Sequence, residues 1–188
     1  PDTKTKSHPK NTEGLDFISD EVVESAQYAI DLANELFDYV IVLGHLGVVP
    51  DGESGITSTY VCENLDGIDL FVDGHSHTVM DGGEMVNGTL IVSTGQYMNN
   101  VGVVQIHVKD GEGVITDAFL VPAEDIMNPA DSEFFASLGV KEIPSDPEVD
   151  QYIAEKTEEL NAVLDTVVAN IPMDLNGERA YVRTRKTN

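Results

Sequence analysis

Apolar side chains recur every three or four residues between positions 20 and 37, which predicts an amphipathic helix. A continuous apolar run follows over residues 39–43 and ends at Gly44, a pattern typical of a buried parallel strand. We expect a shorter helix over 56–65 and a second strand over 69–72. Because helices and strands alternate with short loops between them, this part of the chain predicts an α/β sheet.

The pattern changes beyond residue 77, where short β-rich runs are separated by turn residues. The dipeptide Asn87-Gly88 predicts a tight hairpin turn between two strands. A second pair of strands is expected over 101–109 and 114–121. We interpret this block as a β-meander.

A second amphipathic stretch predicts a helix over 147–169, after a segment rich in proline and acidic residues. Pro147 suits the first helical position, where a backbone N–H would have no partner within the helix. Glu148 and Asp150 suit the first turn, because negative charge there complements the helix dipole.

The amino-acid composition and net charge exclude some classes of partner. The chain has 188 residues, 41% of them hydrophobic, which is enough for a packed core. Its 34 acidic and 10 basic residues give a formal net charge of −24. Such a surface repels nucleic acid and anionic lipid, so we expect neither as a partner. If the substrate is an anion, a bound cation must offset the field of the protein.

The single cysteine, Cys62, excludes a disulfide bond within the chain, and we expect it to be a small buried core residue. No run of about 18 apolar residues occurs, so the sequence predicts no membrane span. The chain opens on Pro1 and its first ten residues are polar. We therefore expect a fragment of a longer protein.

Three of the five histidines follow predicted strands. His45 comes after the first strand, and His75 and His77 come after the second. The carboxyl ends of parallel strands meet at one edge of a sheet, so the three imidazoles should lie near one another. Neutral imidazole is the commonest metal ligand in proteins and suits Zn, Fe, Co or Mn. The sequence therefore predicts a metal site at this edge.

The alternative interpretation is structural, because a histidine at a strand end can simply bond to loop carbonyls. Two Gly-His motifs at successive strand ends favour the metal interpretation. His8 and His107 lack this setting, and we assign them structural or exposed roles. For Asp73 two interpretations stay open: it orients His75, or it is an ordinary turn residue before glycine.

The two Gly-His motifs carry a resemblance to a known family. The run Val42-Leu43-Gly44-His45-Leu46-Gly47 and the later run Asp73-Gly74-His75-Ser76-His77-Thr78 resemble the second half of the calcineurin-like metallophosphoesterase domain of the 5′-nucleotidase family. Residues 92–108 resemble the closing strands of that domain, and residues 147–169 resemble its inter-domain connector. The end of the chain, 178–188, resembles the opening of the C-terminal substrate-binding domain.

The resemblance implies a fold and a domain organisation. The fold class is α/β (α+β): the distal half of a four-layer αββα sandwich, with a connector helix. Residues 1–125 would be the C-terminal half of the metallophosphoesterase domain, and residues 126–170 an acidic loop and the connector helix. Residues 171–188 would begin the truncated C-terminal nucleotidase domain.

The resemblance also implies a chemistry, in which two divalent metal ions (Zn, Mn, Co or similar) serve the hydrolysis of phosphate esters. His45 and His75 resemble two ligands of one ion, and His77 resembles a ligand of the other. Three further residues would surround these ligands or lie near the substrate: Asp73, Gly74 and Ser76. The family's catalytic His–Asp dyad is expected upstream of the chain, and its Gly-Asp and Asn-His motifs do not occur in this sequence.

The expected function is therefore that of a dimetal phosphoesterase fragment, which in the complete enzyme hydrolyses nucleotide monophosphates to nucleoside and phosphate. The alternatives are a cyclic-nucleotide phosphodiesterase, a sugar-nucleotide hydrolase, and a non-catalytic metal-binding or interaction module. We expect the isolated chain to be inactive or very weakly active, and to self-associate or pair with the missing N-terminal half. The family resemblance places the protein outside the cell, in the periplasm or on the cell surface.

Overall fold

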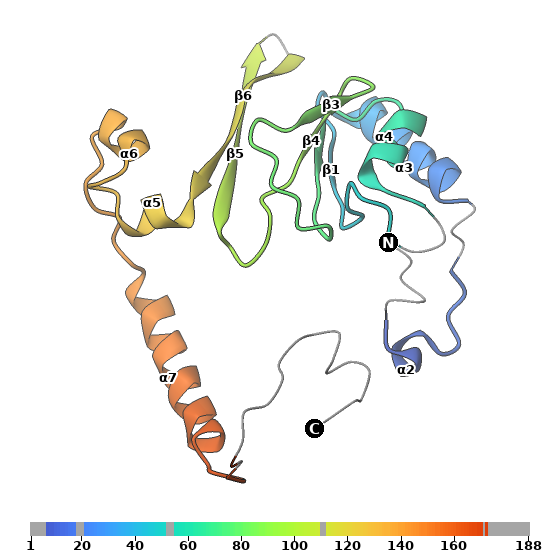
Figure 1. Cartoon of the computed structure of the whole chain (residues 1–188). Helices are drawn as coiled ribbons and strands as arrows, with labels where there is room; N and C mark the ends of the chain where they lie inside the picture. The colour runs from blue at the N-terminus through green and yellow to red at the C-terminus, as the bar shows by residue number, and fades with distance from the viewer. Residues whose placement is uncertain (1–6, 18–20, 52–54, 110–111, 171, 173–188) are drawn as a thin grey trace. The chain divides into compact units, whose positions relative to one another are not determined.

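The computed structural model describes residues 7–17, 21–51, 55–109, 112–170 and 172 (Figure 1). The chain divides into two compact units, Pro1–Ile143 and Pro144–Asn188. We call them the sheet unit and the helix unit and describe each by itself.

Among the described residues, three helices precede or connect the strands of the sheet unit. A single turn, α2, spans Pro9–Thr12 and begins at His8, whose Nδ1 accepts a hydrogen bond from the Lys10 amide. The predicted amphipathic helix is α3, Val22–Leu36, and the shorter predicted helix is α4, Ser58–Asn64. The Thr57 hydroxyl caps α4 by accepting from the Tyr60 amide, which satisfies one of the free N–H groups of the first turn. Both of these helix predictions are confirmed.

The four-stranded sheet has the order β1-β2-β4-β3. Its strands are β1 (Ile41–Leu43), β2 (Leu70–Val72), β3 (Glu84–Val86) and β4 (Thr89–Val92). β1, β2 and β4 run parallel, and β3 pairs antiparallel with β4 across the Asn87-Gly88 turn. The α/β sheet and the hairpin are therefore confirmed. The β-meander is wrong, because β4 joins the parallel sheet beside β2 and makes no ladder with β5.

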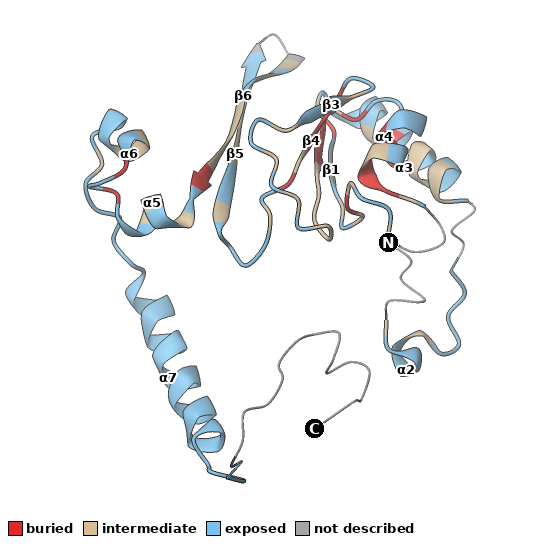
Figure 2. Cartoon of the chain, viewed as in Figure 1, coloured by how far each residue is buried: buried red, intermediate tan, exposed pale blue. Residues whose placement is uncertain are grey.

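The core lies between the sheet and the helices α3 and α4. Its fully or nearly fully buried members are Ile30, Val61, Cys62, Leu65, Ile68, Phe71 and Ile91. Figure 2 shows buried positions on strands of this sheet and on α4. Cys62 is completely buried and is not in a disulfide, as expected from the sequence.

The first strand is less buried than its apolar sequence predicts. Ile41 is 53% exposed and Leu43 is 82% exposed, whereas Phe71 on the neighbouring strand is 1% exposed. The prediction of a buried strand holds for Val40 and for Val42, which packs against the core, and is wrong for Ile41 and Leu43, which lie on the opposite face of β1. Among the described residues, β1 is paired on one side only, with β2. An apolar run reports what a strand is suited to contact and does not say whether a partner is present.

A second, two-stranded sheet consists of β5 (Asn100–Lys109) and β6 (Glu112–Pro122), with a register shift between Gln105 and Ile106. This hairpin lies against the face of the first sheet that points away from the helices. A Cβ on Gly102 would sit 3.0 Å from the Thr94 side chain, and the Leu120 amide donates to Asp81 Oδ1 over 3.0 Å. Between the two sheets lies a largely apolar cavity of about 140 Å³.

Two short helices after β6 were not expected from the sequence. They are α5 (Ala123–Met127) and α6 (Glu133–Ser137). The end of α5 and all of α6 lie in the segment, from residue 126 on, interpreted as an acidic loop before the connector helix. The Ser132 hydroxyl caps α6, and the Phe134 ring packs on the rings of Phe119 and Phe135 at centroid distances of 5.4 and 5.0 Å. One-turn helices of this kind depend on such contacts, which leave no periodic pattern in the sequence.

The helix unit contains α7, Pro147–Leu164. Pro147 stands at its start, as predicted, behind Asp146, whose carboxylate accepts from the amides of Glu148 and Val149. The helix ends at residue 164, five residues before the expected end, and Asp165 is its C-cap residue. The proposed domain limits at 125 and 170 remain predictions, and the segment 173–188 lies outside the described residues.

Candidate metal centre

Two loops meet at the carboxyl edge of the parallel strands. The first loop follows β1 and contains His45; the second follows β2 and contains His75 and His77. Because β1 and β2 are paired in parallel, their ends lie at the same edge of the sheet.

Hydrogen bonds between backbone amides of the first loop and side-chain oxygens of the second hold the two loops together. The Oδ1 atom of Asp73 accepts from the amides of Leu46 and Gly47 over 2.9 and 3.2 Å. The Ser76 hydroxyl oxygen accepts from the Val48 amide over 3.2 Å. The loop after β1 is therefore held by two side chains of the loop after β2.

The rings of His45 and His75 form an edge-to-face pair. Their centroids are 5.2 Å apart and their planes meet at 76°. Gly74 permits this approach, because a Cβ at that position would lie 3.0 Å from His45 Nδ1. The glycine before His75 thus makes room for the imidazole of the other loop.

The second loop holds its histidines in an unusual backbone conformation. His75 has φ of 82° and His77 has φ of 56°, both in the left-handed region that residues with a Cβ seldom adopt. Such conformations cost on the order of 1–3 kcal/mol each and persist where surrounding contacts enforce them. At His75 one such contact is with Asp51, whose Oδ2 lies 3.0 Å from His75 Nε2.

The observed ring contact of His77 is with Tyr97, and not with the His45–His75 pair. Its ring is 6.3 Å from the ring of Tyr97, with which it makes a tilted contact. Within the described part of the chain, no three His, Cys, Asp or Glu side chains come close enough together to hold a metal ion. The structure therefore brings two of the three predicted imidazoles together, and the assignment of all three as ligands remains a prediction.

Asp73 uses its carboxylate on the loop after β1, so its observed bonds do not include His75. Its second oxygen, Oδ2, is buried and has no hydrogen-bond partner among the described residues. Ser76 also bonds to the Thr78 hydroxyl over 2.8 Å. His107, by contrast, is exposed on β5.

The donor set fits part of a divalent metal site. With metal–nitrogen distances of about 2.0–2.1 Å, two imidazoles on one ion have centroids roughly 5–6 Å apart, and the observed pair is spaced accordingly. Imidazole suits Zn, Co and Mn, and the Asp51 carboxylate beside His75 has the chemistry of an outer partner of such a ligand. His45 and His75 are thus the residues that would hold an ion, with the remaining ligands to come from elsewhere.

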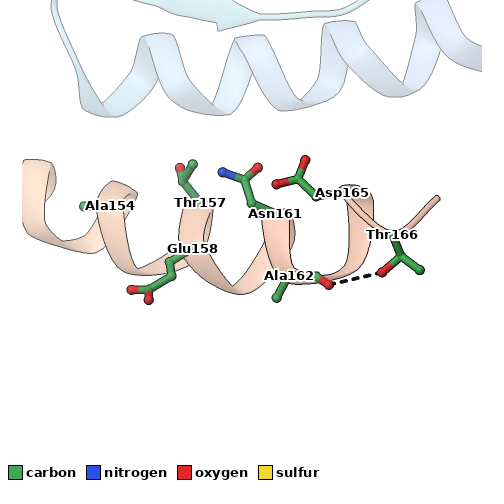
Figure 3. A pocket seen from close by; sticks show the side chains of 7 residues that line it. All are labelled: Ala154, Thr157, Glu158, Asn161, Ala162, Asp165 and Thr166. Atoms are coloured by element: carbon green, nitrogen blue, oxygen red, sulfur yellow. Dashed lines mark hydrogen bonds between the residues drawn. The ribbon is translucent and has the colours of Figure 1, made fainter.

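Two further hollows among the described residues carry no comparable chemistry. A shallow one runs along α7 and is lined by residues of that helix and its end (Figure 3). It contains no imidazole, and the Thr166 hydroxyl beside it donates to the Ala162 carbonyl. A second hollow follows residues 9–16. Neither includes a residue singled out by the sequence.

Two residues near the histidines were not singled out as site residues. Asp51 lies in a Gly/Pro/Asp loop where acidic residues are ordinary, so only the fold reveals its contact with His75. Tyr97 is 85% exposed and has φ of 54°, and Met98 beside it has φ of 55°. An exposed aromatic residue in a strained loop is a functional signal that needs backbone angles to detect.

No family model matches the chain. Over 193 residues, it is 28% identical to the trifunctional nucleotide phosphoesterase YfkN of Bacillus subtilis; the match covers all of this chain and 12% of YfkN. Over 97 residues it is 30% identical to the uncharacterized metallophosphoesterase YunD of the same species, covering 52% of this chain and 18% of YunD. The chain therefore spans less than a fifth of the length of either relative.

Among solved structures, the fold matches that of the sulfate thiohydrolase SoxB of Thermus thermophilus with a TM-score of 0.63 and 23% sequence identity. The match covers 90% of this chain and 26% of the SoxB chain.

The chain is therefore similar in sequence to metallophosphoesterases and has an α/β fold like that of SoxB. The resemblance to metallophosphoesterases of the 5′-nucleotidase family is confirmed by these homologues, one of which is a nucleotide phosphoesterase. No described helix is long and apolar enough to cross a membrane.

Proposed function

We propose that this chain supplies the distal half of the active site of a dimetal phosphoesterase that hydrolyses nucleotide phosphate monoesters to nucleoside and phosphate. The observation that carries the proposal is the pairing of His45 and His75, whose rings lie 5.2 Å apart at the ends of adjacent parallel strands. The kinship to YfkN, a nucleotide phosphoesterase, supports the substrate class.

The residues of the chain have distinct tasks in this proposal. His45 and His75 hold one ion, His77 contributes to the other, and Asp73 and Ser76 keep the two loops in register. Divalent ions held there, Zn, Mn or Co, would supply a nucleophile from water and neutralise charge on the phosphate. Because the net charge of the chain is −24, an anionic substrate needs such a positive centre.

The complete site requires further ligands, since the described residues assemble two imidazoles and not three metal-binding groups. We propose that these ligands and the catalytic dyad come from an N-terminal half that pairs with this chain. Without that half, the chain would self-associate. The open β1 edge, with Ile41 and Leu43 exposed, is consistent with such pairing. The family resemblance supports a location outside the cell, in the periplasm or on the cell surface.

Metal binding by the chain is the first test. After treatment with a chelator and dialysis, the chain is titrated with Zn²⁺ or Mn²⁺ and the binding is measured by isothermal titration calorimetry. We expect His75→Ala to abolish binding, whereas the matched control His107→Ala, at an exposed site on β5, retains it. Equal binding by both variants would contradict the assignment of the site.

Hydrolysis of AMP is the second test. We expect the isolated chain to show little or no activity above the uncatalysed rate, and addition of the N-terminal half to produce chelator-sensitive release of phosphate. Strong chelator-sensitive hydrolysis by the 188 residues alone would overturn the half-site proposal. Failure to hydrolyse AMP in the completed protein, with turnover of a cyclic nucleotide or a sugar nucleotide, would move the substrate class within the family.

A further inference from the structure

We propose that Asp51 is a positioning residue of this site: it accepts the Nε2 proton of His75 and thereby leaves Nδ1 of that ring as the nitrogen that binds a cation. This inference rests on the proposed function, because it concerns the same centre. It goes further by assigning a role to a residue outside the two Gly-His motifs.

Geometry is the first argument. Oδ2 of Asp51 and Nε2 of His75 are 3.0 Å apart, within the range of an N–H···O hydrogen bond. The His75 side chain is 22% exposed and that of Asp51 is 43% exposed, so the contact is partly shielded from water. The two residues are 24 positions apart, in loops that follow different strands. The contact is therefore a product of the fold and not of local sequence.

Backbone conformation is the second argument. His75 is held at φ of 82°, and the Gly74 before it leaves space for His45. The main chain thus fixes the position from which the His75 side chain extends. Rotation about the side-chain bonds would still allow either ring nitrogen of His75 to face His45. A bond to Asp51 selects one of these orientations, which is the usual role of a carboxylate behind a metal-binding histidine.

The chemistry of the two groups then fixes the tautomer. An ionised carboxylate is an acceptor only, so the ring nitrogen that faces it must carry the proton. A neutral imidazole has one N–H and one lone pair, and a proton on Nε2 leaves the lone pair on Nδ1. Asp51 therefore prepares His75 as a ligand before any ion is bound.

The test is made first on the metal-free chain, by ¹⁵N NMR of its five histidines at pH 8.5, where free imidazole is neutral. We expect His75 in the wild-type chain to show a single form with the proton on Nε2. In Asp51→Ala we expect a mixture that includes the form with the proton on Nδ1. The control Asp38→Ala removes an exposed carboxylate between α3 and β1 and should leave the His75 signals unchanged.

Zinc affinity is the second readout. We expect Asp51→Ala to lower the affinity of the chain for Zn²⁺ by about 10- to 100-fold, the usual effect of removing such a carboxylate. Asp51→Glu should restore part of it. The Asp38 control should stay within about twofold of the wild type.

The outcomes separate this inference from the proposed function. If the wild-type chain binds no zinc, the proposed function fails, while the His75 tautomer still decides the role of Asp51. A wild-type His75 with its proton on Nδ1, or a tautomer unchanged in Asp51→Ala, overturns the inference even if zinc binds. Circular dichroism checks that each variant is folded; if Asp51→Ala is not, Asp51→Asn replaces it, with a weaker acceptor and the same expected direction.

Discussion

Apolar residues recur at regular spacing in both the sheet unit and the helix unit, but many of them are buried in the first, whereas those described in the second are exposed. In the sheet unit, the apolar positions of α3, α4, β2 and β4 meet in one core, where Phe71 and Ile91 are 1% and 0% exposed. In the helix unit, every described residue of α7 is exposed, as the uninterrupted pale colour of that helix in Figure 2 shows. Its apolar side chains include Leu160, which is 60% exposed.

The difference teaches that periodicity specifies an element and its apolar face, but not the partner of that face. Both regions form the helices or strands that their patterns predict. In the sheet unit, burial stabilises the structure, and it also positions the loops that carry His45 and His75. In α7, stability rests on helix propensity, capping and side-chain pairs, because the apolar face contacts nothing among the described residues of its unit.

The largest expected effect is the loss of core packing. Phe71→Ala removes a fully buried ring and should lower the free energy of unfolding by about 3–5 kcal/mol. Leu160→Ala in α7 is the matched control and should change it by no more than about 0.5 kcal/mol. Urea denaturation followed by circular dichroism measures both. Equal destabilisation by the two variants would show that α7 is packed as tightly as the core, and the contrast would be lost.

Glycine substitutions sharpen the contrast within the sheet unit. A Cβ on Gly44 would lie 2.5 Å from two ring carbons of Phe71, so Gly44→Ala should cost about 1–3 kcal/mol through overpacking. A Cβ on Gly74 meets His45 Nδ1 at 3.0 Å, so Gly74→Ala should displace an imidazole rather than the core. We expect it to weaken zinc binding with a smaller loss of stability than Gly44→Ala. If urea denaturation shows a larger loss of stability for Gly74→Ala than for Gly44→Ala, His45 is packed as a core residue and the expectation is wrong.

The sequence predicts most elements of the sheet unit, because many of the residues that are apolar in the sequence pattern are also buried in the structure. The spacing of apolar residues gives α3 and α4, and Asn87-Gly88 gives the β3–β4 hairpin, since that dipeptide adopts the positive φ angles observed, 48° and 85°. The sheet order was missed because a parallel β2–β4 pair is a long-range contact. Local patterns do not distinguish a strand that continues a meander from one inserted beside an earlier strand.

The candidate site is predictable only in part, for a similar reason. Glycine before His45 and before His75, at the ends of two successive strands, is visible in the sequence, and the fold brings these two rings together. His77 shares the second motif, yet its ring contacts Tyr97, because the left-handed φ at His75 and His77 breaks the alternation that a strand would impose. The Asp51 contact depends on loop geometry, which the sequence pattern does not encode.

The buried thiol of Cys62 allows the core and α7 to be compared by measurements that depend on pH. Burial, together with the nearby Asp73 charge and against a hydrogen bond with Thr89, raises the pKa of Cys62 to about 11. A raised pKa in the folded state means that the folded chain holds the proton more tightly. The stability contributed by this group is therefore complete below the unfolded-state pKa of about 8.5 and is lost as the pH rises toward 11.

We expect the free energy of unfolding to fall between pH 8.5 and 11 more steeply in the wild type than in Cys62→Ala. At pH 8, Cys62 should react with a disulfide reagent at least about 100-fold more slowly than an exposed thiol, because little thiolate is present. The reference is Leu160→Cys in the Cys62→Ala background, which places one thiol on α7. Comparable rates for the two thiols would contradict the burial of Cys62.

The smallest expected effect concerns the start of α7. Asp146 accepts from the Glu148 and Val149 amides over 2.9 and 3.2 Å, so Asp146→Ala should destabilise the helix by about 0.5–2 kcal/mol. At the other end, Asp165→Ala removes a negative charge from the C-terminus and should stabilise the helix by about 0.3–1 kcal/mol. Amide hydrogen exchange reads the two units separately. Opposite changes in α7, with constant protection of β2 and β4, would show that capping and dipole effects govern a helix without a buried face. Parallel losses in both units under Asp146→Ala would instead mean that α7 shares the cooperativity of the core.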